Sequence, residues 1–260
     1  MPDHSTWFNY LLPNFEELLA DFRQALGVTF LNHTPIEIQY VLGFLFIAVL
    51  LLILVFSVRG RINDVEKSLI PEGKLTLQTF FEAMAEGAIN TMTSMMERKA
   101  ALYFLPLIGT CAFVILFSNL IGLVPGFLPP TSVINTTLAM AGIIFLTTHI
   151  YGVKEHGFIK YFGHWCGPIH SWRPDVVILM ILMFFIELIG HLARPASLSL
   201  RLAGNMHAGH LVMATFIGLF PLFLPVPIIV LKVLVCIVQT AVFCILSIVY
   251  IGMAIAHEEH

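Results

Sequence analysis

The chain has 260 residues, of which 58% are hydrophobic and 11% are charged, and its mean hydropathy is +0.90. This composition predicts a polytopic membrane protein and excludes a soluble globular domain. The net charge of −3 indicates little, because the distribution of charge along a membrane protein matters more than its sum. The four cysteines are scattered without paired spacing, so they indicate neither a disulfide framework nor a zinc ribbon.

Residues 1–35 are predicted to form an N-terminal arm. They lack the basic start, apolar core and cleavage site of a signal peptide, and we expect none. Apolar residues recur in the arm at helical spacing, which predicts a short amphipathic helix on the membrane surface. Residues 36–58 then form the first apolar stretch that is long enough to span a bilayer.

Residues 72–99 alternate polar and apolar groups, which predicts an amphipathic helix lying in the membrane interface. Residues 100–123 and 133–153 are the second and third predicted spans, joined by the Pro- and Gly-rich turn VPGFLPPTS. Asn119 and Asn135 near this turn fit the wall of an aqueous inlet and interhelical hydrogen bonding equally well.

The segment 154–173 is predicted to be a loop. It contains four residues of metal-ligating type: His156, His164, Cys166 and His170. Their spacing matches no standard metal site, and aromatic and histidine residues are common at membrane interfaces. We therefore expect no metal in this loop.

Residues 174–219 are predicted to form one long oblique helix. At about 1.5 Å per residue the stretch is roughly 70 Å long, whereas a bilayer core of about 30 Å needs only about 20 residues. Two separate spans would need a polar turn between them. The only breaker is Pro195, and the residues after it again favour helix, so we expect a kink without a turn.

One face of this long helix gathers polar residues. At about 100° per residue, five of them fall within a sector of roughly 80°: Glu187, His191, Arg194, Arg201 and Asn205. A strip of small residues beside this sector permits close approach of another helix: Ala193, Ser197, Gly204 and Ala208. Ions inside a membrane are functional by default, and about 20 Å of helix separates Arg201 from Glu187, too far for a structural pair.

The last predicted helix, residues 226–256, carries a second polar stripe. It follows a turn enforced by the three prolines of FPLFLPVP. Lys232, Gln239 and Tyr250 fall on one of its faces at about 100° per residue. Facing polar stripes on two neighbouring helices of a long tilted hairpin favour a proton or ion path between them.

The distribution of Lys and Arg predicts the orientation of the chain. Six of these residues lie in 59–99 and three in 154–173, whereas the turns at 124–132 and 220–227 have none. We therefore expect these two basic segments and the C-terminus in the cytoplasm, and the N-terminus in the periplasm. The whole pattern predicts an all-α polytopic membrane protein, with five membrane-crossing helices plus a surface amphipathic helix in a single membrane domain over 36–260.

The run ARPASLSLRLAGNMHAGHL resembles the signature of subunit a of the bacterial F-type rotary ATP synthase, which contains SLRLFGNMxAG. Glu187 precedes Arg201 by fourteen residues, as in the bacterial family pattern. The resemblance extends through Gln239 to the C-terminal HEEH and takes in SNLIGLVP and INTTLAMA upstream. It covers residues 100–260 well and the earlier part mainly by layout.

The resemblance implies a proton-translocating stator subunit in the bacterial inner membrane. The implied partners are a ring of small hairpin (c) subunits with mid-membrane carboxylates, peripheral-stalk b subunits, the soluble ATPase sector and membrane lipid. We expect neither a cofactor nor a nucleic-acid partner. No nucleotide-binding signature is present, so another chain would handle ATP.

The resemblance also implies roles for single residues. Arg201 is expected to be the essential ion-pairing and gating residue between two offset half-channels, because its charge cannot be lost. Glu187 is assigned to the cytoplasmic half-channel. Four residues are assigned to the periplasmic side: Asn205, His210, Lys232 and Gln239.

His210 and Lys232 depart from the family pattern. Many bacterial relatives have a carboxylate and a histidine at these positions, and mitochondrial relatives tend toward His and Glu. Two basic groups form no salt bridge and repel one another when both are charged. Alternatively, Lys232 snorkels toward the interface from its position near Pro227 and never meets His210. We favour protons over sodium ions as the transported species.

Two other classes of function fit an apolar chain with a buried arginine. One is a stand-alone secondary transporter or channel that uses Arg201 to bind an anionic substrate. The other is a structural membrane subunit without a transport role. Co-purification with a ring of small subunits and a soluble ATPase sector separates the rotary-synthase hypothesis from a stand-alone transporter.

Overall fold

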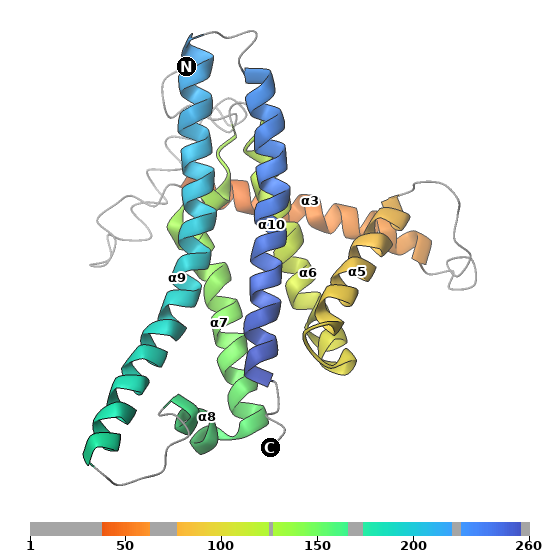
Figure 1. The fold of residues 1–260 in the computed structure, drawn as a ribbon. Coiled ribbons are helices and arrows are strands. Elements are labelled where there is room, and N and C mark those ends of the chain that lie inside the picture. The colour runs from red at the N-terminus through yellow and green to blue at the C-terminus, as the bar shows by residue number, and fades with distance from the viewer. Residues whose placement is uncertain (1–37, 63–76, 125–126, 166–173, 220–224, 256–260) are drawn as a thin grey trace. The chain divides into compact units, whose positions relative to one another are not determined.

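The computed structural model describes residues 38–62, 77–124, 127–165, 174–219 and 225–255, and within these ranges it contains helices and no strand. Five of the described helices are long and apolar enough to cross a membrane (Figure 1). They are α3 (Ile38–Ile62), α6 (Arg98–Ile121), α7 (Ile134–His156), α9 (Pro174–Leu219) and α10 (Pro225–Ile255). The prediction of an all-α polytopic membrane protein is confirmed. The predicted N-terminal arm lies outside the described residues.

Two short segments differ from the predicted helix boundaries. The amphipathic helix α5 (Leu77–Thr93) ends before residue 99, because a turn closes it with backbone bonds from Met95 and Met96 to the carbonyl oxygen of Met92. The segment predicted as a loop contains the eight-residue helix α8 (Phe158–Trp165). Gly157 precedes α8 with a φ of +80°, a conformation that glycine adopts without strain, so α7 ends and the chain turns there.

Helix α9 runs without interruption through Pro195, which confirms the prediction of one 46-residue helix without a turn. Proline has no backbone N–H, so Pro195 cannot donate the helical hydrogen bond to the carbonyl of His191. The ribbon of α9 bends along its course while remaining helical (Figure 1). The oblique course of α9 through a bilayer stays a prediction.

The chain divides into two compact units. The first comprises residues 1–73, 113–133 and 206–238, and the second comprises residues 74–112, 134–205 and 239–260. Within the first unit, the turn after α6 folds back on α3. Gly43 of α3 lies so close to this turn that an added Cβ would stand 3.3 Å from Pro130.

The hydrogen-bonding alternative for Asn119 is realised inside the first unit. Thr131 donates its hydroxyl to the side-chain oxygen of Asn119 at 2.7 Å, and both side chains are buried. The side-chain nitrogen of Asn119 is buried without a partner among the described residues. Asn135, which belongs to the second unit, is exposed. Asn119 therefore ties the end of α6 to the short 3-10 helix η1 (Pro130–Ser132).

In the second unit, α5, α6 and α10 share a hydrophobic core. Its buried members are Met92, Ala101, Phe104, Ile108, Ile248 and Ile251. The apolar side of α5 reaches this core through Met92, whereas Glu82 and Glu86 on its other side are exposed. The helix is thus amphipathic as predicted, and its location in the membrane interface stays a prediction.

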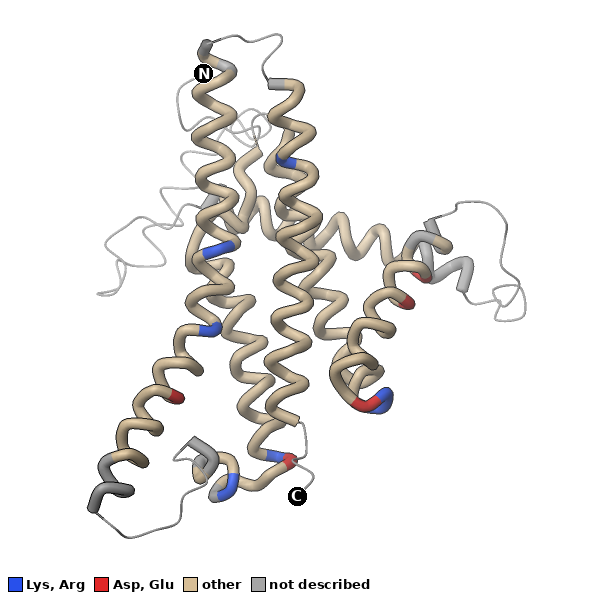
Figure 2. Tube along the Cα trace, viewed as in Figure 1, with Lys and Arg blue, Asp and Glu red and all other residues tan. Residues whose placement is uncertain are grey.

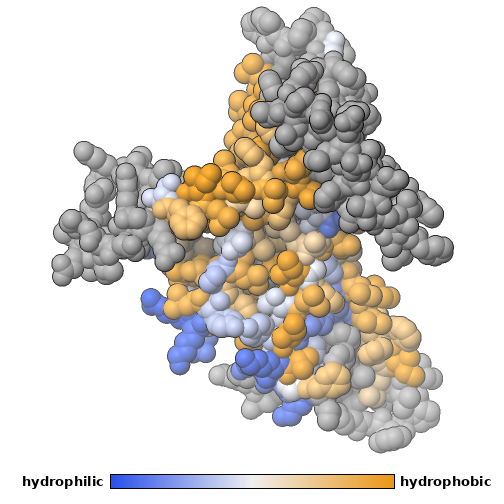
Figure 3. All heavy atoms as spheres, turned by 180° about the vertical axis from the view of Figure 1, so that it is seen from behind, coloured by the Kyte–Doolittle hydropathy of each residue, from blue (hydrophilic) through white to orange (hydrophobic). Residues whose placement is uncertain are grey.

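Large apolar side chains cover much of the exposed surface of the described helices, as Figure 3 shows for one face of the molecule. Examples are Phe56 of α3, which is 66% exposed, Ile189 of α9 at 64% and Val230 of α10 at 66%. Charged residues are sparse on α9 and α10 (Figure 2). Apolar helix faces of this extent are unfavourable in water, so we expect lipid or other subunits to cover them.

Candidate functional site

A polar contact joins α9 to α10 inside the second unit. The side-chain amide of Asn205 donates a hydrogen bond of 2.9 Å to the side-chain oxygen of Gln239. Gln239 is buried, with 5% of its surface exposed, and its neighbour Thr240 is buried as well. Two of the residues predicted for the ion path are therefore in direct contact, and at this pair the polar sides of the two helices face each other.

Arg201 lies one helical turn before Asn205 and is exposed. Among the described residues it has no hydrogen-bond or ion-pair partner. Leu200, beside it in the sequence, is 59% exposed, whereas Leu202 is fully buried. A guanidinium stays charged at any physiological pH, so at an apolar surface of this kind it needs an anionic partner or water.

A hydrogen bond between buried hydroxyls sets the orientation of α9 around Arg201. Ser199 and Thr137 of α7 lie 2.9 Å apart, and both side chains are buried. Positions two apart on a helix differ by about 200° in direction, so burying Ser199 against α7 turns Arg201 away from it. Gly204 lies on the exposed side of α9 with Arg201, and an added Cβ there would meet nothing within 4 Å.

Glu187 belongs to a charged cluster on α9 that does not include Arg201. Its Oε1 lies 3.2 Å from Nε2 of His191 and 4.0 Å from Nη2 of Arg194. The guanidinium of Arg194 also lies over the ring of Tyr250, 5.4 Å from its centroid. Glu187, His191 and Arg194 are spaced i, i+4 and i+7 in the sequence. This spacing places their side chains on one face of a helix, and it predicts a local cluster.

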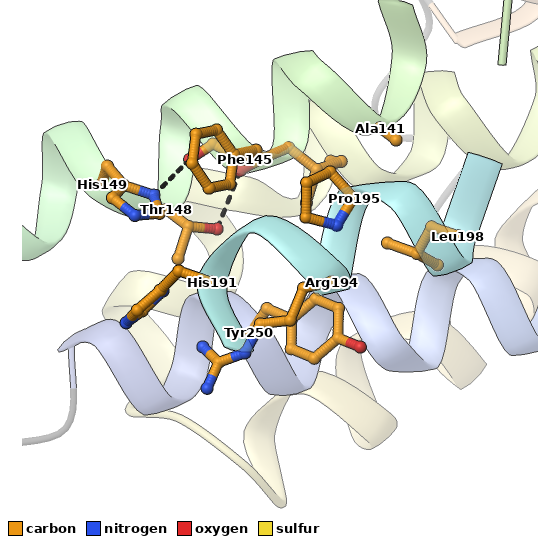
Figure 4. A pocket seen from close by; sticks show the side chains of 10 residues that line it. Ala141, Phe145, Thr148, His149, His191, Arg194, Pro195, Leu198 and Tyr250 are labelled. Atoms are coloured by element: carbon orange, nitrogen blue, oxygen red, sulfur yellow. Dashed lines mark hydrogen bonds between the residues drawn. The ribbon is translucent and has the colours of Figure 1, made fainter. Parts of the chain in front are cut away.

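A small cavity, with about 10 Å³ of space accessible to water, lies between α7, α9 and α10 within the second unit (Figure 4). Its lining combines two histidines, an arginine and a tyrosine with apolar groups: Ala141, Ile144, Phe145, Thr148, His149, His191, Arg194, Pro195, Leu198 and Tyr250. His149 was absent from the residues predicted for the path. Nothing in the sequence separated it from an ordinary core histidine, because α7 carries no polar stripe at that position.

Tyr161 of α8 closes on the same region from outside the spans. Its ring centroid lies 5.9 Å from that of His149. The ring also packs on Gly152, where an added Cβ would stand 2.5 Å from it. Burial raises the pKa of the Tyr161 hydroxyl, and the nearby positive charge of Arg194 acts in the opposite direction. Tyr161 thus stays an uncharged hydrogen-bonding group at neutral pH.

His210 and Lys232 both lie within the first unit. The ammonium of Lys232 lies 3.5 Å from the sulfur of Met213 on α9, and its Cε would be 2.9 Å from a Cβ added at Gly209. Lys232 therefore reaches α9 at the residue that precedes His210. The Nε2 of His210 would stand 3.2 Å from a Cβ added at Gly122, the residue after α6, so the imidazole is directed toward the end of that helix.

The part of the chain that the structure describes holds no group of three or more His, Cys, Asp or Glu residues that is arranged to bind a metal ion. Two of the metal-ligating residues in the segment 154–173, Cys166 and His170, lie outside the described residues. The three described cysteines, Cys111, Cys236 and Cys244, form no disulfide with one another.

The fold and the site define a multi-pass membrane protein with buried and exposed polar groups along its two longest helices. A model of the family described as ATP synthase A chain matches residues 42–252. An ATP synthase subunit a from Sorangium cellulosum (strain So ce56) is 40% identical over 263 residues and covers 100% of both chains. The chain therefore belongs to the ATP synthase A chain family, which places it in the membrane sector of that enzyme.

Two further relatives agree with this assignment. An ATP synthase subunit a from Geobacter sulfurreducens is 48% identical over 182 residues, 70% of this chain and 74% of the relative. An ATP synthase subunit a 3 from Pelobacter propionicus is 45% identical over 207 residues, 80% of this chain and 82% of the relative. The two relatives thus match most of the chain.

Proposed function

We propose that this chain is the proton-translocating stator subunit of an F-type ATP synthase membrane sector, and that Arg201 couples proton flow to rotation of a ring of small subunits. The observation that carries the proposal is Arg201 itself. It is an exposed guanidinium on an apolar helix face, without a partner among the described residues, in a chain of the ATP synthase A chain family.

The proposed step at Arg201 is an exchange of ion pairs. A ring carboxylate that has lost its proton pairs with the guanidinium, because two opposite charges in lipid cost less together than apart. The next carboxylate then replaces the first, which takes up a proton and moves on into lipid. The fixed positive charge also repels a free proton, so it blocks direct leakage between the two access paths.

Two offset half-channels supply and remove these protons. We assign Glu187 to the cytoplasmic path, since its side chain is 46% exposed and the carboxylate contacts His191 beside a cavity. The Asn205–Gln239 hydrogen bond supports a polar path on the other side of Arg201. His210 and Lys232 are assigned to the same periplasmic path, because His210 belongs to the last part of α9 and Lys232 of α10 contacts that part.

The surroundings of the subunit follow from the same proposal. The chain lies in the bacterial inner membrane, with its N-terminus in the periplasm and its C-terminus in the cytoplasm. The exposed strip of small residues on α9 faces the c ring, which approaches closely because Gly204 leaves open space. Peripheral-stalk b subunits cover other apolar faces, and the soluble ATPase sector completes the complex.

The test is Arg201→Ala in the whole complex, with ATP-driven proton pumping measured in inverted membrane vesicles. We expect pumping to be abolished while the complex still assembles. Arg98→Ala at the exposed start of α6 is the matched control and should pump normally. Appreciable pumping by the Arg201→Ala complex would refute the proposal. Purification without a ring or an ATPase sector would instead favour the stand-alone anion transporter.

A further inference from the structure

Two histidines on different helices lie together at the cavity of the second unit. The ring centroids of His149 on α7 and His191 on α9 are 5.0 Å apart, with an interplanar angle of 70°. Both rings line the cavity, and Figure 4 shows them at the same end of it. His191 is only 8% exposed. Leucine would fill such a helix contact without burying polar nitrogens, so packing alone does not explain the pair.

His191 links the cavity to the carboxylate of Glu187. The Nε2 of His191 lies 3.2 Å from Oε1 of Glu187, and the two side chains are 10% and 46% exposed. An accessible carboxylate therefore contacts a nearly buried imidazole. An imidazole takes up a proton at one nitrogen and releases one from the other, which no other neutral side chain does near pH 7.

His149 is held in one tautomer by the backbone of α7. Its Nδ1 lies 2.8 Å from the carbonyl oxygen of Phe145. A carbonyl only accepts hydrogen bonds, so Nδ1 carries the proton and Nε2 is the basic nitrogen of the neutral ring. The groups around the two rings are Glu187 and Arg194 on α9, Tyr250 on α10 and Tyr161 on α8.

We propose that Glu187, His191 and His149 form a proton relay that extends the cytoplasmic half-channel from α9 to α7; this inference rests on the proposed function. A protonated Glu187 gives its proton to Nε2 of His191 and becomes a carboxylate. His191 then releases the proton of Nδ1, through water in the cavity, to Nε2 of His149. His191 ends neutral in its other tautomer, and His149 passes the proton from Nε2 to water.

The cavity has the size and chemistry that this step needs. Its space accessible to water is about 10 Å³, which is room for about one water molecule, and polar groups from three helices line it. The Nη2 of Arg194, 4.0 Å from Oε1 of Glu187, adds a positive charge beside that end of the relay.

The experiment measures ATP synthesis by the intact complex in inverted vesicles, driven by an imposed potassium diffusion potential. We expect His191→Ala and His149→Ala each to slow ATP synthesis by about tenfold. This loss is smaller than is usual when a proton-transfer group is removed, because water in the cavity partly replaces the missing imidazole. Imidazole added at millimolar concentration should restore most of the lost rate in His191→Ala. His156→Ala, which removes a histidine of α7 outside the cavity, should leave the rate unchanged.

His191→Gln is the second variant and preserves most of the volume, so it tests the relay even where alanine prevents assembly. A wild-type rate for both His191→Gln and His149→Gln would overturn the relay. A loss in His191→Ala that imidazole does not restore would also overturn it, because the role would then be structural. If only the relay is wrong, Arg201→Ala still abolishes ATP synthesis. If the Arg201→Ala complex synthesises ATP, the proposed function itself is wrong.

Discussion

Replacing Asn205 with alanine should destabilise the contact between α9 and α10 through its effect on Gln239. The wild-type amide donates to the Gln239 oxygen at 2.9 Å, and only 5% of the Gln239 surface is exposed. Without that donor the buried oxygen loses its partner, which costs about 1–3 kcal/mol. Gln239→Leu removes the buried amide altogether, and the exposed Asn205 side chain can then be hydrated. We therefore expect Gln239→Leu to lower the free energy of unfolding by about 1 kcal/mol or less.

A double-mutant cycle measures this asymmetry. The free energy of unfolding is determined for the purified subunit in mixed micelles titrated with a denaturing detergent, for both single variants and the double variant. We expect Asn205→Ala to change stability very little once Gln239 is leucine, so the coupling energy should equal the wild-type loss of about 1–3 kcal/mol. Additive losses in the two single variants would show that the hydrogen bond contributes no stability and would refute this reasoning.

Three further predictions concern other parts of the site. Gly122→Ala should lower the free energy of unfolding by about 1–3 kcal/mol in the same titration and should disturb His210. The reason is that the new Cβ would stand 2.8 Å from the rigid Pro129 ring. An unchanged free energy of unfolding would show that the turn adapts. Arg201→Lys should retain little proton pumping, since an ammonium is more strongly hydrated and lacks the planar fork; near-normal pumping would mean that any cation suffices. A water-soluble thiol reagent should label Glu187→Cys but not Leu231→Cys, which is 59% exposed on an apolar face; equal labelling would mean that the wet and dry faces are misassigned.

The helices of this chain were predictable because a membrane constrains them strongly. Every buried backbone group in lipid needs an internal partner, so a long apolar run such as 174–219 has one solution, a helix, and its predicted bounds match α9. The start of α6 at Arg98 was harder to place. There the polar end of α5 and the basic start of the next span are adjacent, and only the turn after Thr93 separates them.

The candidate site was only partly predictable, for a physical reason. Helical spacing places residues of one helix on a face, and it correctly brought Asn205 and Gln239 to facing sides of α9 and α10. Spacing says nothing of which residue on a third helix meets that face. His149 of α7 was therefore missed, although its ring lies 5.0 Å from that of His191.

Pro195 connects the shape of α9 to the chemistry of the cavity. A proline within a helix cannot donate to the carbonyl four residues earlier, which here belongs to His191, and both residues line the cavity. The carbonyl of His191 therefore receives no hydrogen bond from Pro195, and a water molecule in the cavity would be a suitable donor. A single proline would then serve both the bend of α9 and the hydration that the proposed proton relay requires.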